Sequence, residues 1–124
     1  MVVQWIKNKE TSGSATLTNN YLMTNAQFKE KFESCYKAII GIDEFKRIVL
    51  KPISLDEHES LKFKDVTKVN VNVQKSYLRF GNTKIIDEIK DIIGLEIPKE
   101  GIKGKTTWDD KESALVVEIR RDEK

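Results

Sequence analysis

The sequence predicts an α+β fold in which two similar halves, each of ββαββ type, form one compact domain about a pseudo-two-fold axis. Two observations support this prediction. The 124 residues have the usual length of a single domain, which we expect to span residues 1–124. A tyrosine–leucine pair, a polar helix start and a hairpin with an acidic corner occur twice in the same order, through duplication or through convergence on common hairpin chemistry. The halves should cover about residues 1–54 and 65–121, joined by a charged connector.

The predicted strands are short apolar or alternating segments bounded by turn residues. Pro52 lacks a backbone N–H and should close the strand that precedes it. The valines of residues 66–73 alternate with polar residues, as in a strand with one buried face. Hairpins are predicted for residues 2–6 with 15–18, 38–42 with 47–50, and 105–108 with 114–119, and a further extended segment for 76–80.

Two helices are predicted. The first should begin at Thr24, because Gln27 stands three residues later, the spacing of a capping box. The second should run from about Thr83 to Ile93 and end at Gly94 in a left-handed cap. Apolar residues at helical spacing should form the buried face of each helix, and these are Phe28, Phe32, Ile86, Ile89 and Ile93.

Composition limits the classes of function. The formal net charge is +2, so any binding to nucleic acid has to come from a local patch of basic residues. One cysteine and one histidine cannot form a disulfide or a Cys/His zinc site, and we expect no metal and no cofactor. Cys35 lies in an apolar helical pattern and is interpreted as a buried, inert thiol rather than a reactive one. Without a secretory signal or a membrane-spanning run, a cytoplasmic location is expected.

No arrangement of residues indicates catalysis, so we predict that the protein is not an enzyme. The paired acids, such as Asp43-Glu44 and Asp109-Asp110, fall at predicted corners, where solvated turn residues are common. His58 has glutamates on both sides and no nucleophile at a fixed spacing, which favours a titrating surface group. Residues 98–104 are rich in glycine and lysine and are predicted to form a loop. The glycines lead into a predicted strand rather than a helix, so this segment does not match a phosphate-binding loop.

The segment of residues 43–52, Asp-Glu-Phe-Lys-Arg-Ile-Val-Leu-Lys-Pro, resembles a signature of the MraZ and AbrB group. That signature is Asp-x-x-x-Arg, then an apolar strand and a proline. Lys46 stands where the group usually has glycine, and Lys51 separates the apolar strand from the proline. The resemblance implies a swapped-hairpin transcription factor that binds DNA.

Basic residues in two clusters are the candidate site. They are Lys46, Arg47, Lys51, Lys75 and Arg79. Tyr77 and Arg79 alternate with Leu78 and Phe80, so Arg79 should be exposed while Leu78 and Phe80 lie in the core. The clusters could bind DNA phosphates or could be ordinary solvated surface. The sequence thus favours a DNA-binding regulator or antitoxin-like protein, and the alternative is a module that binds another protein or itself as a homodimer.

Overall fold

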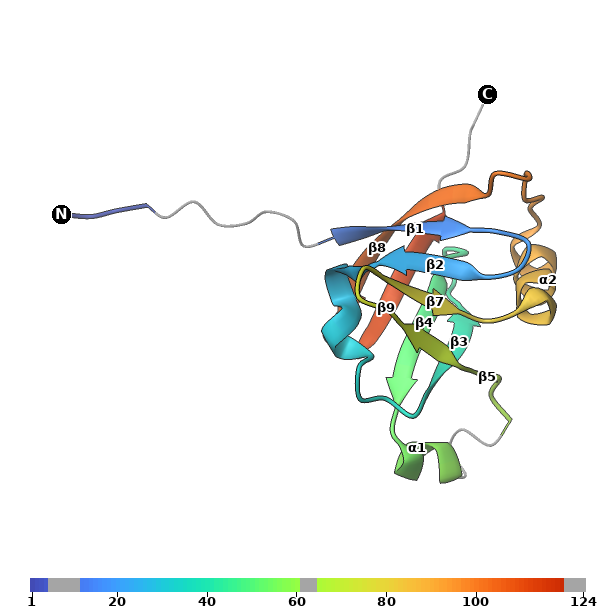
Figure 1. Cartoon of the computed structure of the whole chain (residues 1–124), viewed down its shortest axis with the longest axis horizontal. Helices are drawn as coiled ribbons and strands as arrows, with labels where there is room; N and C mark the ends of the chain where they lie inside the picture. Colours follow the sequence, from blue (N-terminus) through green and yellow to red (C-terminus); the bar gives the residue numbers. More distant parts are fainter. Residues whose placement is uncertain (5–11, 61–64, 120–124) are drawn as a thin grey trace.

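The protein is described by a computed structural model that covers residues 1–4, 12–60 and 65–119 (Figure 1). Within these residues the chain forms strands, two α-helices and one 3₁₀ helix. In chain order the elements are β1 (Ser12–Leu17), β2 (Leu22–Asn25), η1 (Ala26–Lys31), β3 (Lys37–Ile42), β4 (Ile48–Ile53), α1 (Leu55–Glu59), β5 (Lys68–Val69), β6 (Val71–Val73), β7 (Tyr77–Phe80), α2 (Thr83–Ile93), β8 (Ile102–Asp109) and β9 (Ala114–Ile119).

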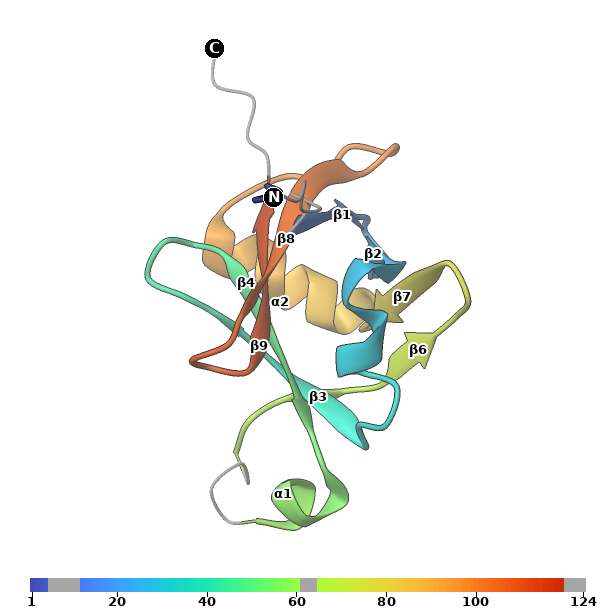
Figure 2. The same cartoon turned by 90° about the vertical axis from the view of Figure 1, so that its left-hand side faces the viewer.

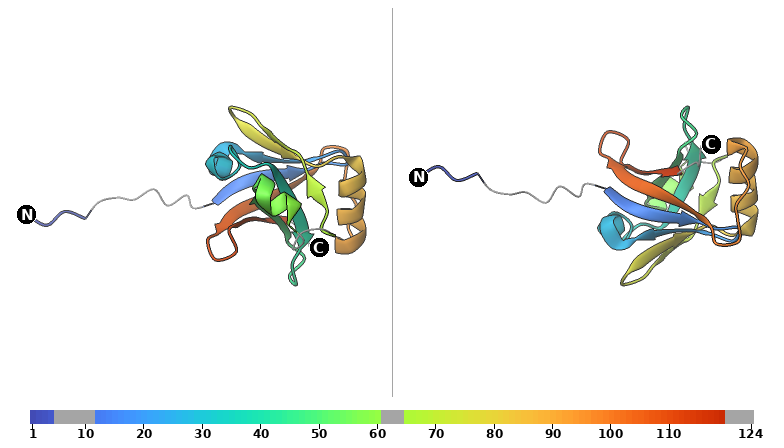
Figure 3. Two further views of the ribbon diagram at one scale, coloured as in Figure 1. Left: turned by 90° about the horizontal axis from the view of Figure 1, so that it is seen from below. Right: turned by 90° about the horizontal axis from the view of Figure 1, so that it is seen from above.

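The strands form one antiparallel sheet that curls into a nearly closed barrel. Their order is β5-β3-β4-β9-β8-β1-β2-β7-β6. The strands at the two ends of this order, β5 and β6, are separated in the chain by Asn70 alone. One continuous segment therefore belongs to both ends of the sheet, and this connection brings the two ends together (Figure 3).

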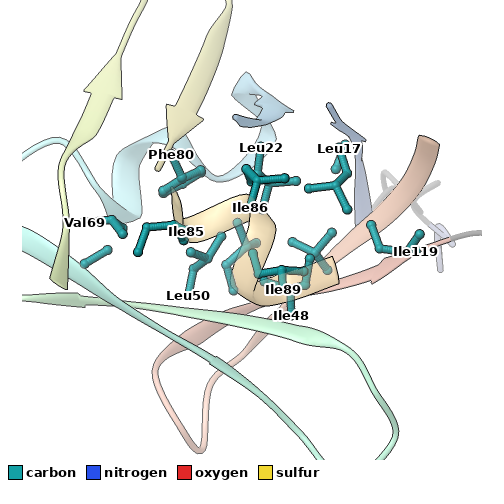
Figure 4. Close-up of a cluster of buried hydrophobic side chains, with 14 of the residues drawn as sticks. Leu17, Leu22, Ile48, Leu50, Val69, Phe80, Ile85, Ile86, Ile89 and Ile119 are labelled. Carbon is teal, nitrogen blue, oxygen red and sulfur yellow. The ribbon is translucent and has the colours of Figure 1, made fainter. Parts of the chain in front are cut away.

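Helix α2 lies across one end of the barrel, where the strands surround it in Figure 2. The side chain of Asn82 accepts a hydrogen bond from the backbone N–H of Ile85 at 3.1 Å and caps the helix start. Gly94 ends the helix with φ 75°, a left-handed conformation that glycine adopts without steric cost. Both helix ends confirm the prediction. Figure 4 shows Ile86 and Ile89 among apolar side chains of the barrel, and both are buried as expected.

The first predicted helix is much shorter than expected. Thr24 belongs to β2 and pairs with Leu78 of β7, so it cannot start a helix. Asn25 caps η1 instead, and the backbone of Phe28 departs from helical geometry. Phe32 is buried, and its ring lies 6.2 Å from that of Trp108, so η1 brings aromatic side chains to the end of the barrel opposite α2.

The predicted α+β class with two ββαββ halves is wrong. Strands make up 41% of the structure and helices 21%, and the strands form one barrel-like sheet. The expected halves do not form separate units, because β1 pairs with β8 and β3 pairs with β5. Sequence periodicity identifies several of the strands but carries no information on such distant pairing, which is why the class was missed.

The predicted hairpins have mixed outcomes. The pairs β3–β4 and β8–β9 confirm two of them, although β4 continues through Pro52 to Ile53. The first hairpin is wrong, because β1 pairs with β2 and β8 instead of with residues 2–6. Residues 2–4 are not in a strand, and the rest of that expected strand lies outside the described residues. The charged connector contains α1, whose start has a capping box formed by Ser54 and Glu57.

Candidate nucleic-acid interface

The structure divides the five candidate residues into two groups. Lys46, Arg47 and Lys51 lie on the β3–β4 hairpin, and Lys75 and Arg79 lie on the β6–β7 hairpin. These hairpins project from opposite sides of the barrel in Figures 2 and 3. A single flat contact with a nucleic acid therefore cannot include both groups.

Arg47 stabilises its own turn. Its Nε donates to Oδ2 of Asp43 at 2.7 Å, and Oδ1 of Asp43 accepts from the backbone N–H groups of Phe45 and Arg47 at 2.9 and 2.8 Å. Burial raises the pKa of Asp43, but the hydrogen bonds from Arg47 and Phe45 outweigh this effect and lower the pKa below its ordinary value. The Asp-x-x-x-Arg pattern is thus a local ion pair that holds the hairpin tip.

Lys46 and Lys51 also have partners within the fold. Lys46 has φ 64° at the hairpin tip, and its Nζ lies 3.4 Å from the backbone oxygen of Ile92 in α2. The Nζ of Lys51 donates to the backbone oxygen of Glu112 at 2.7 Å. Carboxylates lie close to these cations: Asp43 and Glu44 are at the tip of the β3–β4 hairpin, and Glu112 is at the tip of the β8–β9 hairpin. The local charge is therefore mixed.

Lys75 and Arg79 border a different surface, which faces outward from strands β8, β1, β2 and β7. In the strand register Thr16 lies opposite both Lys103 and Met23, and Met23 lies opposite Arg79. These four residues therefore form one row across four strands. The Nζ of Lys103 donates to Oγ1 of Thr16 at 3.1 Å, which confirms that their side chains share the outer face.

A second row lies beside the first. Lys105 is opposite Ser14 on β1, and Asn25 on β2 is opposite Tyr77 on β7. Lys75 stands in the turn two residues before Tyr77. We call this surface the basic sheet face and define it by Ser14, Thr16, Met23, Asn25, Lys75, Tyr77, Arg79, Lys103 and Lys105.

The basic sheet face is locally positive although the chain is nearly neutral. None of its residues has a carboxylate, and Lys75, Arg79, Lys103 and Lys105 form no ion pair within the described residues. Glu118 of β9 lies opposite Lys105 and marks the acidic border. Because these four side chains are exposed, their charges are available to a ligand.

The face also offers polar groups between its cations. A shallow hollow of about 280 Å³ is lined by residues that include Ser14, Thr16, Asn25 and Ser76. The guanidinium carbon of Arg79 lies 5.4 Å from the centre of the Tyr21 ring, a cation–π contact that orients the arginine. Hydroxyl, amide and cationic groups in this arrangement can donate hydrogen bonds to phosphate oxygens.

Sequence reasoning missed Lys103, because the glycines around it suggested a loop, and placed Lys105 at the start of a strand without grouping it with other cations. The structure gives the glycines another role. A Cβ atom on Gly104 would lie 2.8 Å from the backbone oxygen of Glu118, so close strand packing requires glycine there. The alternation of Lys103, Lys105 and Thr107 was the signal that could have identified an outward-facing strand.

Cys35, His58 and the acidic side chains are the groups considered for metal binding or nucleophilic chemistry among the residues that the structure covers. Among the described residues, no group of three or more His, Cys, Asp and Glu side chains could hold a metal ion. Cys35 is partly buried, and burial raises the pKa of its thiol, which lowers the population of the nucleophilic thiolate. His58 packs against Tyr36 with their ring centres 4.9 Å apart.

Comparisons with family models, curated protein sequences and solved structures find no match to this chain. The resemblance of residues 43–52 to the MraZ and AbrB group therefore stays a prediction. In the part of the chain that the structure describes, every helix is too short or too polar to cross a membrane.

Proposed function

We propose that the protein is a non-enzymatic, cytoplasmic DNA-binding protein of the transcription-regulator or antitoxin type, and that it binds DNA through the basic sheet face. The observation that carries this proposal is the register of four neighbouring strands. It aligns Lys103 and Arg79 in one row, with Lys105 and Lys75 beside them and no carboxylate between. Such a surface attracts the phosphate backbone without requiring a high net charge.

This proposal keeps two of the five sequence-predicted residues. Lys75 and Arg79 belong to the basic sheet face, whereas Arg47 is held by Asp43. Lys46 and Lys51 already contact backbone oxygens on other elements. We therefore assign Lys46, Arg47 and Lys51 to the stability of the hairpin.

The test is a titration of fluorescently labelled duplex DNA followed by anisotropy. Non-specific DNA binders typically reach dissociation constants of about 10⁻⁴ to 10⁻⁶ M at physiological salt, so binding should be readily measured at about 50 mM salt. With four phosphate contacts, the plot of log affinity against log salt should have a slope of about −3.6.

Charge variants separate the two groups of cations. Replacing Lys103 and Lys105 with alanine should weaken binding and reduce the slope by about 1.8, because each lost contact removes about 0.9 of a released counterion. The matched control is the triple alanine variant of Lys46, Arg47 and Lys51, which should keep the full slope. The absence of DNA binding by the wild-type protein at about 50 mM salt would refute the proposed function.

A second candidate function is a protein–protein interaction module that binds a second copy of this chain. A groove of about 510 Å³ lies over the outer face of β3 and β4. Its rim has both signs of charge, in Lys51 and Glu112, so the groove can face its own copy about a two-fold axis with opposite charges adjacent. The apolar residues that line it are Ile39, Ile40, Gly41, Ile42, Val49, Val66 and Ala114.

Gly41 favours this second candidate. A Cβ atom at Gly41 would have no neighbour within 4 Å, so internal packing does not require glycine. Glycine in a strand costs about 0.5–1 kcal/mol relative to alanine and often marks the close approach of a ligand or another backbone. A Gly41→Val variant should fill the groove without a clash. Sedimentation velocity should show a wild-type dimer that Gly41→Val converts to a monomer, and a wild-type monomer at all concentrations would exclude this candidate.

A further inference from the structure

We propose that the ligand of the basic sheet face is B-form duplex DNA, and that the β1–β2 ribbon enters the major groove with Thr16 and Met23 towards the base edges. This inference rests on the proposed function and adds the form of the DNA and the residues that select its sequence. In this arrangement Lys103 and Arg79, on the flanking strands, contact the two phosphate backbones.

The width of the four-strand surface fits the groove. Neighbouring strands lie about 4.8 Å apart, so the three spacings from β8 to β7 give about 14 Å along the curved sheet between the backbones of Lys103 and Arg79. The major groove is about 12 Å wide and admits a two-stranded β-ribbon. The flanking cations therefore stand above the two walls of the groove when β1 and β2 are inside it.

The lengths of the side chains fit this arrangement as well. The ribbon presents short groups at its centre, the hydroxyls of Ser14 and Thr16. The flanking strands present long cationic side chains, Lys103, Lys105 and Arg79. The short groups of the middle strands line the shallow hollow and leave room for base edges, while the long flanking side chains can reach the phosphates beside the groove.

The aromatic residues of this surface argue against a single-stranded ligand. Proteins that bind single strands commonly stack bases on exposed aromatic rings. Tyr77 is only partly exposed, and Tyr21 is partly buried beneath the guanidinium of Arg79. The described residues of the face thus lack an open aromatic platform for unstacked bases.

Thr16 and Met23 offer two kinds of contact to base edges. Oγ1 of Thr16 already accepts a hydrogen bond from Lys103, so its proton is available to an acceptor on a base. Met23 is partly exposed beside Thr16, and its apolar side chain can contact the methyl group of thymine. These contacts differ between base pairs, whereas the phosphate contacts of Lys103 and Arg79 do not.

The experiment begins by selecting a preferred duplex from a random pool with the full-length wild-type protein. Anisotropy then gives affinities for this duplex, for a scrambled duplex and for each single strand. We expect the selected duplex to bind at least tenfold more tightly than either single strand. Replacing its thymines with deoxyuridine, which lacks the methyl group, should weaken wild-type binding severalfold and leave Met23→Ala binding unchanged.

Two protein variants separate sequence selection from phosphate contact. Thr16→Val keeps the shape of the side chain and should reduce the affinity ratio of selected to scrambled duplex by about fivefold or more, since one wrong base pair typically costs that much. The slope of log affinity against log salt should stay the same. Lys103→Ala should weaken both duplexes equally and reduce that slope by about 0.9. Thr107→Val, on the same face but beyond both rows, is the control and should change neither quantity.

The outcomes distinguish this inference from the proposed function. Absence of binding to any nucleic acid at about 50 mM salt refutes both. Binding in which single strands equal or exceed the duplex refutes the major-groove arrangement alone. Unchanged selectivity in Thr16→Val, together with a loss of affinity on deoxyuridine that is as large for Met23→Ala as for the wild type, also overturns the arrangement. The deoxyuridine series with wild-type protein does not depend on how a variant folds.

Discussion

Truncation of Ile89 to alanine tests whether the apolar face of α2 packs on the core at one end of the barrel. Ile89 is 3% exposed and lies in the main hydrophobic cluster. The change removes three carbon groups, which at about 0.8 kcal/mol each corresponds to about 2.4 kcal/mol of lost burial. The cavity left behind adds to this loss, so we expect the free energy of unfolding to fall by about 2.4 to 5 kcal/mol. For a chain of this size the thermal midpoint should fall by about 7 °C or more.

Ile92 provides a matched control on the same helix, because its side chain is 53% exposed. Ile92→Ala removes the same atoms from a solvated position and gives alanine, which has the higher helix propensity. We expect its free energy of unfolding to change by less than about 0.5 kcal/mol. Urea denaturation followed by circular dichroism measures both variants. Equal stability of Ile89→Ala and Ile92→Ala would show that α2 does not seal the core in the way described.

Three further predictions concern local stability. Although burial raises the pKa of Asp43, its hydrogen bonds lower it, so Asp43 should stabilise the fold above its unfolded pKa of about 3.9 and lose this contribution as the pH falls through the lower folded value. Acid titration of stability should show a smaller loss in that window for Asp43→Asn. Asn82→Ala removes the cap of α2 and should cost about 1 kcal/mol in urea denaturation. Gly104→Ala places a Cβ atom 2.8 Å from the backbone oxygen of Glu118 and should lower the free energy of unfolding by about 1–3 kcal/mol. Gly41→Ala has open space and should be neutral or stabilising. Thermal denaturation of both variants measures this difference.

The parts of the fold that sequence predicts well are those set by neighbouring residues. The ends of α2 follow from Asn82 and Gly94, whose effects act within one helical turn. The hairpins β3–β4 and β8–β9 likewise connect adjacent strands through short corners. The barrel itself depends on the pairing of β1 with β8, and no local pattern specifies that partner.

In the candidate site, too, features set by neighbouring residues were predictable and those set by distant strand pairing were not. Alternation along residues 77–80 predicted that Leu78 and Phe80 face the core and that Arg79 is exposed, and the structure confirms this. The grouping of Arg79 with Lys103 could not be predicted, because three strand pairings bring them into one row. Arg47 is the opposite case, because its ion-pair partner, Asp43, lies in its own turn and only four residues away in the sequence.

The pairing of β1 with β8 also orders events during synthesis of the chain. Residues 12–17 are made before their partners at 102–109, and the rest of the described sheet apart from β9 is made between them. Until then β1 has one open edge, and the barrel cannot close around its core. We therefore expect chains interrupted before β8 to present unpaired strands and to aggregate more readily than the completed chain.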